Sequence, residues 1–174
     1  YFPPPTLIPN RTLRERFVRV RPPQATVGVL YFHGNAGAAT EVPWLASVCE
    51  QSGLAFYAAE YPGYGNTQPL PRTEAEMFRA AEQALGWVYE DGIEEVILWG
   101  RPLGSAPAVH LASTRTVRGL VVHAGFASIF TVVNRVAGGW MRALDLDMFA
   151  NADKMARVQC PVFFVHPSND TLIR

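Results

Sequence analysis

Short runs of consecutive apolar residues recur along this chain, and segments long enough to form helices separate them. Such runs are typical of strands buried on both faces of a parallel sheet. We expect strands of this kind at residues 27–32 (VGVLYF), 54–59 (LAFYAA), 96–99, 120–123 and 162–165. Parallel neighbours need crossover connections, so strands that alternate with helices predict repeated βαβ units. The predicted fold class is therefore α/β, with a doubly wound, mostly parallel sheet covered by helices on both faces.

The segments between these runs carry helix signals. Thr73 and Glu76 have the spacing of a capping box, and apolar residues then recur on one helical face until Gly92 ends the pattern. Further helices are expected over residues 42–53, over residues 103–113 and over most of residues 128–158.

The N-terminal part of the chain has a different character. Residues 1–14 are rich in proline and predict an extended lead-in. Weak alternation at residues 17–21 indicates an edge strand with one solvated face. We therefore divide the chain into a lead-in with an edge strand, residues 1–26, and a core, residues 27–174.

Composition limits the possible function classes. Apolar residues make up 49% of the chain, charged residues 17%, and the net charge is zero, which suits a globular domain and gives no electrostatic reason to bind nucleic acid. No apolar stretch approaches the roughly 18–20 residues of a membrane span. The two cysteines lie far apart and form no metal-type pair, so we expect no metal, no other cofactor and no disulfide framework. A cytoplasmic or membrane-peripheral location is the corresponding expectation, and the oligomeric state stays open.

A predicted strand, a turn and a predicted helix carry the sequence GRPLG at residues 100–104. This is the layout of a nucleophile elbow, G-x-S-x-G, in which two glycines let strand and helix approach around a sharp turn. The central position holds Pro102, which has no hydroxyl and can form no acyl-enzyme. Its ring also fixes φ near about −65°. We therefore expect both the nucleophile and the strained elbow geometry to be lost.

Four segments together resemble the α/β-hydrolase family. Residues 33–37 (HGNAG) resemble its oxyanion loop, and residues 61–65 (YPGYG) resemble the loop after the next strand. Residues 99–108 (WGRPLGSAPA) resemble the elbow and its helix, and residues 160–170 (CPVFFVHPSND) resemble the segment that delivers the triad acid. The segments follow the family order, and the likeness is to small-lid serine hydrolases, which include protein depalmitoylases and relatives described as serine peptidases.

The resemblance implies hydrolysis of an ester, thioester or amide bond by a Ser–His–Asp triad. It places the nucleophile at Pro102, the acid at Asp170 and the N–H donors of the oxyanion hole at Asn35 and Leu103. Each such donor contributes about 3–4 kcal/mol in related sites. Pro167 stands where the family pattern has glycine. The family's catalytic histidine, final strand and final helix have no counterpart here, so we expect a fold that is incomplete at its C-terminal edge.

Other polar residues near these motifs have ordinary explanations. We expect His33 to hold its loop by hydrogen bonds, and Ser105 to pack or bond to the backbone inside its helix. His110 and His123 are expected to be common core or surface residues. His166 ends a strand and is expected to pack near the site without acting as a base.

The chain as written is therefore expected not to hydrolyse its family's substrates. The short interval between His123 and Cys160 allows only a small lid, which suits an acylated protein, a lipid or a small ester as ligand. Three interpretations remain open. The chain is a pseudoenzyme that binds ligands or serves as a scaffold, a decayed or partial copy of a hydrolase, or an active hydrolase in which Pro102 is an error or a variant.

Overall fold

The structure is a computed structural model that describes residues 12–35, 37–65, 73–128 and 149–170. Over these residues a six-stranded sheet has the strand order β1-β3-β2-β4-β5-β6. Its strands are β1 (Val18–Val20), β2 (Val27–Phe32), β3 (Ala55–Ala59), β4 (Glu95–Gly100), β5 (Gly119–His123) and β6 (Val162–Val165). Within this sheet β1 pairs antiparallel with β3, and the other neighbours are parallel. The predicted α/β, mostly parallel sheet is confirmed.

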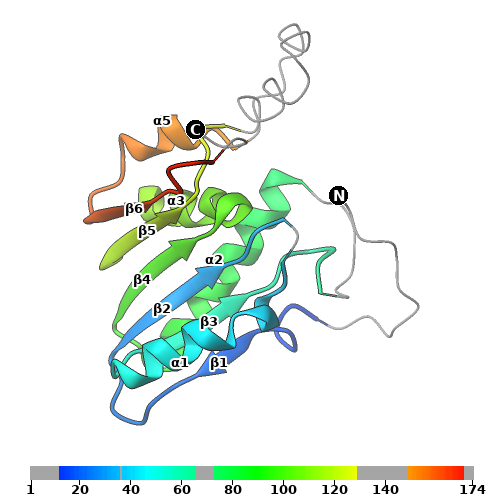
Figure 1. The fold of residues 1–174 in the computed structure, drawn as a ribbon. Helices are drawn as coiled ribbons and strands as arrows, with labels where there is room; N and C mark the ends of the chain where they lie inside the picture. Colours follow the sequence, from blue (N-terminus) through cyan, green and yellow to red (C-terminus); the bar gives the residue numbers. More distant parts are fainter. Residues whose placement is uncertain (1–11, 36, 66–72, 129–148, 171–174) are drawn as a thin grey trace, which may run out of the picture.

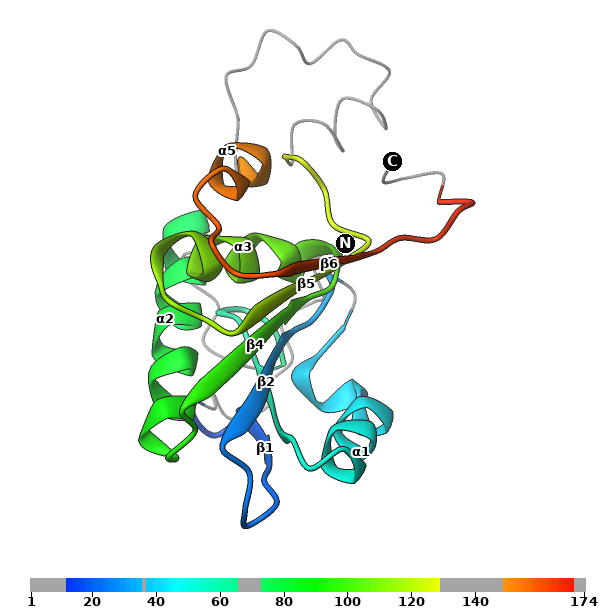
Figure 2. The ribbon, with the colours of Figure 1, turned by 90° about the vertical axis from the view of Figure 1, so that its left-hand side faces the viewer.

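Helices cover both faces of the sheet (Figure 1). One face carries α1 (Pro43–Gln51), and the other carries α2 (Glu74–Glu90), α3 (Ser105–Thr114) and α5 (Asn151–Met155). Figure 2 shows the two layers on opposite sides of the sheet. Short 3₁₀ turns, η1 (Ala39–Glu41) and η2 (Pro102–Gly104), precede α1 and α3. None of the helices in the described part of the chain is long and apolar enough to cross a membrane.

Burial follows from this layering. The apolar runs of β2 and β3 are almost entirely buried because helices pack on both of their faces. The Thr73 side chain caps α2 by accepting a hydrogen bond from the backbone N–H of Glu76 at 3.2 Å, as the sequence predicts. α3 is built from small residues and lies between the sheet, α2 and α5, so nearly its whole length is buried.

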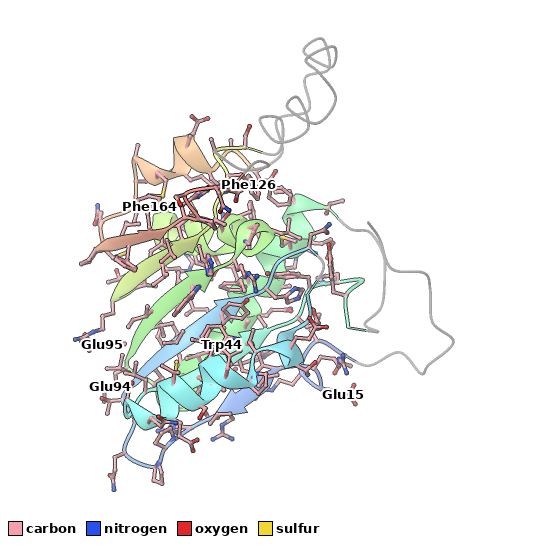
Figure 3. The ribbon with its side chains drawn as sticks, viewed as in Figure 1. Glu15, Trp44, Glu94, Glu95, Phe126 and Phe164 are labelled. Atoms are coloured by element: carbon pink, nitrogen blue, oxygen red, sulfur yellow. The ribbon has the colours of Figure 1, made fainter. Side chains whose placement is uncertain are left out.

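Some apolar side chains remain exposed (Figure 3). On α1, Trp44 is 57% exposed and Val48 is 53% exposed, because the helix turns Leu45 and Cys49 toward the sheet instead. Val48 is apolar like Leu45, but the structure places it on the solvent side of the helix.

Two expectations fall partly outside the described residues. The helical pattern at residues 128–158 includes residues 129–148, which are not described, and the described remainder contains the short helix α5. The proline-rich lead-in falls mostly on residues 1–11, which are also not described, whereas the edge strand at residues 17–21 is confirmed as β1.

Candidate active site

The carboxyl ends of the parallel strands bring the motif residues to one edge of the sheet. Phe32 at the end of β2 pairs in register with Gly100 at the end of β4, and Gly100 pairs with Val122 on β5. The backbone N–H of Arg101 donates to the carbonyl oxygen of Phe32 at 3.0 Å. A Cβ added to Gly34 would lie 3.7 Å from Cδ of Pro102. The loop after β2 therefore lies directly against the elbow after β4.

Two glycines make the elbow possible. A side chain at Gly100 would overlap the carbonyl oxygen of Gly104, and one at Gly104 would overlap the carbonyl oxygen of Phe32. The strand, the turn and the first residue of α3 thus touch through their backbones, as the elbow motif requires.

Pro102 gives this turn an ordinary backbone conformation. Among the described residues other than glycine, positive φ occurs at Ala124 and Phe149 and not at Pro102. The elbow is instead a 3₁₀ turn, closed by a hydrogen bond of 2.6 Å from the N–H of Gly104 to the carbonyl oxygen of Arg101. Proline at the first position of such a turn loses no needed donor and has a suitable φ.

Ser105 lies just behind the elbow and is completely buried. Its Oγ donates to the carbonyl oxygen of Pro102 at 2.6 Å and lies 3.4 Å from Nδ2 of Asn151. The same Nδ2 donates to the carbonyl oxygen of Phe126 at 3.0 Å. The expectation that Ser105 bonds to the backbone within its helix is confirmed, whereas the role of Asn151 was not foreseen.

His33, in the loop after β2, is buried, and its ring lies tilted against that of Tyr61, with ring centroids 4.3 Å apart. Its Nε2 lies 2.5 Å from Oε1 of Glu60, and its Nδ1 lies 2.8 Å from the carbonyl oxygen of Gly34. The hydroxyl of Tyr61 donates to the carbonyl oxygen of His33 at 2.9 Å. His33 therefore holds its loop by hydrogen bonds, as expected, and its partner Glu60 is a residue that the sequence did not single out.

Asn35 is exposed at the tip of the same loop. Its Oδ1 accepts a hydrogen bond from the hydroxyl of Tyr64, in the loop after β3, at 2.5 Å. The aromatic ring of Tyr64 is buried beside His33, with ring centroids 5.4 Å apart. The loop that resembles the family's oxyanion loop and the loop after β3 thus support each other.

Asp170, which the resemblance predicts as the triad acid, lies after β6. Oδ2 of Asp170 lies 3.6 Å from Nε2 of His166, and the N–H of Asp170 donates to the carbonyl oxygen of Pro167 at 3.2 Å. Pro167 therefore begins a tight turn that ends at Asp170. The side chain of His166 is about one-third exposed, and the sequence did not predict its pairing with Asp170.

Burial shapes the electrostatics of this edge. It lowers the pKa of His123, and the nearby charges of Arg101 and His166 lower that pKa further. Burial also raises the pKa of Tyr31, and the charge of Arg101 and a hydrogen bond with it partly offset this rise.

His110 lies elsewhere, on α3, where its ring stacks on Phe78. Within the described ranges, no three His, Cys, Asp or Glu residues are grouped as a metal site.

The buried polar side chains in the described part of the chain are His33, Glu60, Ser105 and Asn151. They form two pairs. His33 and Glu60 join the loops after β2 and β3, and Ser105 and Asn151 join the first residues of α3 and α5. Glu60 shows one signal in the sequence, because it is an acid that directly follows a buried strand. Asn151 shows none.

Comparison with known proteins identifies relatives. No protein-family model matches the chain. It is 29% identical to the alpha/beta hydrolase domain-containing protein aho-3 of Caenorhabditis elegans, over 94% of this chain and 50% of that protein. It is 29% identical to human alpha/beta hydrolase domain-containing protein 17B, over 90% of this chain and 54% of that protein. The chain spans about half the length of the curated relatives it matches.

Solved structures share the same architecture. An alpha-beta hydrolase from Vibrio vulnificus superposes with a TM-score of 0.68 at 20% identity, over 79% of this chain and 55% of that chain. A structure from a study of the metagenome-derived lipolytic enzymes LipS and LipT superposes with a TM-score of 0.67 at 15% identity, over 94% of this chain and 80% of that chain. An alpha-beta serine hydrolase homologue from Coxiella burnetii superposes with a TM-score of 0.59 at 17% identity, over 90% of this chain and 83% of that chain. At these identities the likeness is one of fold.

Proposed function

We propose, from the premise that this chain is a member of the α/β-hydrolase family, that it keeps the site loops of a serine hydrolase without the hydrolytic activity. The family reaction is attack of a serine hydroxyl on an ester, thioester or amide carbonyl. The observation that carries the proposal is Pro102 at the centre of the elbow. Proline supplies no nucleophile, and its fixed φ removes the strained conformation that would present one.

The hydroxyl closest in sequence does not replace the missing serine. Ser105 is fully buried, and its proton is donated to the carbonyl oxygen of Pro102. A nucleophile must reach the substrate carbonyl and have a base within hydrogen-bond distance. Ser105 meets neither condition in this conformation.

The remaining site residues keep the roles of binding groups in this proposal. The backbone N–H groups of Asn35 and Leu103 are the candidate donors to a carbonyl oxygen, and Asp170 occupies the acid position. Such donors act on the ligand without requiring a covalent step. The function we favour is therefore non-catalytic binding of an acyl ligand, carried by a protein, a lipid or a small ester. The lipolytic names among the structural neighbours are consistent with that ligand class.

A second interpretation, a decayed or partial copy of a hydrolase, is favoured by one observation. Phe163 and Phe164 on β6 are 66% and 63% exposed, although they lie on opposite faces of the strand. An edge strand with exposed aromatic residues on both faces promotes self-association. A chain that aggregates and binds no acyl ligand would support this second interpretation.

The test compares the chain with its Pro102→Ser variant. Each is incubated with p-nitrophenyl butyrate, with a fluorophosphonate probe and, for binding, with octanoate in a calorimetric titration. We expect the unmodified chain to hydrolyse the ester no faster than a heat-denatured sample, to resist the probe and to bind octanoate saturably. Turnover that Ser105→Ala or Asp170→Asn abolishes would refute the proposal.

The Pro102→Ser variant tests the third interpretation, an active hydrolase with an altered residue. Probe labelling of the serine introduced at position 102 would indicate that the rest of the catalytic geometry is intact. Absence of labelling would count against an otherwise complete site.

A further inference from the structure

We propose that Glu60 is the positioning residue of the loop that carries Asn35, and that it acts through His33. The assignment of Asn35 as a ligand donor rests on the function proposed above, whereas the positioning of its loop does not.

The carboxylate of Glu60 contacts the loop on both sides of its tip at Asn35. Oε1 contacts Nε2 of His33 at 2.5 Å, and Oε2 accepts a hydrogen bond from the N–H of Ala39 at 3.3 Å. Oε1 also accepts from the N–H of Tyr61 at 3.3 Å. His33 precedes Asn35 and Ala39 follows it, so one side chain holds the loop before and after its tip.

The hydrogen-bond partners of His33 and Glu60 determine how many hydrogens the pair shares. The carbonyl oxygen of Gly34 can only accept, so Nδ1 of His33 carries a hydrogen. The contact between Nε2 and Glu60 then requires one further hydrogen, carried by either partner. The buried pair is therefore neutral as a unit, which lowers the desolvation cost of burying it.

The surroundings leave little room for another arrangement. Gly65 has a φ of +54°, and a side chain there would overlap the Glu60 carboxylate. The guanidinium of Arg16 lies close to the same position of Gly65. The backbone of the loop after β3 thus packs closely against the carboxylate of Glu60.

A buried pair of this kind is not needed for stability alone. Apolar side chains of similar volume are often as stable or more stable in such positions. What a carboxylate adds is direction, because it fixes the imidazole ring and the Ala39 N–H in one orientation. This argues for a role in loop geometry.

The experiment is nuclear magnetic resonance of the ¹⁵N-labelled chain and its Glu60→Gln variant. Glutamine keeps the size of the side chain but presents an NH₂ group where one oxygen accepts. We expect hydrogen exchange at the amides of Asn35 and Ala39 to accelerate about tenfold, the loss of roughly one charge-assisted hydrogen bond. The exchange-protected signal of the proton between Nε2 of the His33 ring and the Glu60 carboxylate should disappear. Amides in β2 and β4 should change less than about threefold.

The matched control is Glu41→Gln. Glu41 also accepts a hydrogen bond from this loop, at the N–H of Ala38 and a distance of 3.2 Å, but at the surface. We expect it to leave the His33 ring signal unchanged. Glu60→Asp serves as a second variant if Glu60→Gln does not fold. Its shorter side chain cannot keep both the His33 and the Ala39 contact, so exchange at the Asn35 and Ala39 amides should accelerate while the sheet is unaffected.

Two results would overturn the proposal. One is unchanged hydrogen exchange at the Asn35 and Ala39 amides in Glu60→Gln, or in Glu60→Asp if that is the variant that folds. The other is equal acceleration throughout the sheet, which a purely structural role would produce. Failure of octanoate to bind the unmodified chain would instead defeat the proposed function and leave the positioning role standing, because these signals are read without ligand.

Discussion

The Oγ atom of Ser105 donates a hydrogen bond of 2.6 Å to the carbonyl oxygen of Pro102. The hydroxyl nearest in sequence to Pro102 is thus engaged in a hydrogen bond that holds the turn. Ser105 also touches the loop after β5, because a side chain on Gly125 would lie 3.4 Å from its Oγ. The serine is therefore a structural residue of the elbow.

We expect Ser105→Ala to lower the free energy of unfolding by about 1 kcal/mol, the value of a buried hydrogen bond. Urea denaturation measures the change. The control is Ser113→Ala, because Ser113 makes the same kind of bond to the carbonyl oxygen of His110 at 2.8 Å but is half-buried. A loss in Ser105→Ala no larger than in Ser113→Ala would contradict the structural role.

Backbone contact at the elbow predicts a large effect of Gly104→Ala. The added methyl group would overlap the carbonyl oxygen of Phe32, so strand and helix must separate. We expect a destabilisation of about 3 kcal/mol or more, at the upper end for overpacked sites. Gly86→Ala is the control, since nothing lies within 4 Å of the new methyl group in α2. It should stabilise the chain by roughly 0.5–1 kcal/mol, and thermal unfolding distinguishes the two.

These contacts explain what the sequence could predict. The apolar run at residues 27–32 matches β2 residue for residue, because a strand buried on both faces leaves an uninterrupted local signal. The cap at Thr73 was also predictable, since its partner Glu76 is three residues away. The elbow was recognisable because its glycines and Pro102 are contiguous.

Glu60 and Asn151 could not be predicted, because their partners are distant in sequence. Glu60 is 27 residues from His33, and Asn151 is 46 residues from Ser105. No periodicity or local spacing encodes a pair at such a separation. The fold must first bring the strand ends together, and only then do these side chains acquire partners.

The stability of the chain should fall in mild acid. Burial is the main cause that lowers the pKa of His110, with Lys154 and Arg115 lowering it further and Glu82 and Glu74 opposing them. Below about pH 6.5 the unfolded chain takes up a proton that the folded chain resists, so stability is full above that pH and declines as pH falls toward the lowered pKa.

Replacement of this histidine tests the sign. We expect His110→Phe to keep the stack on Phe78 and to flatten the dependence of the melting temperature on pH between about 7 and 5. The pKa of His123 is lowered as well, mainly by burial, so a smaller slope should remain. An unchanged slope would mean that His110 does not contribute.

The exposed aromatic residues of β6 predict self-association. Phe164→Lys should reduce the apparent mass in sedimentation experiments and change the free energy of unfolding by less than about 0.5 kcal/mol, as is usual for surface substitutions. Tyr89→Lys on α2 is the control, because Tyr89 is exposed but lies within a helix. An equal effect of both variants would indicate general charge repulsion and not a specific strand edge.

The strand order carries a consequence for ligand access. The chain leaves β2 through α1 on one face to reach β3, and it leaves β4 through α3 on the other face to reach β5. The two connections therefore diverge from adjacent strand ends, and such a switch point is where open α/β sheets form their ligand crevice. The position of this switch point follows from the strand order and does not depend on a hydroxyl group at residue 102. A substitution at residue 102 changes the side chain at this switch point, whereas only a different path of the chain could move the switch point itself.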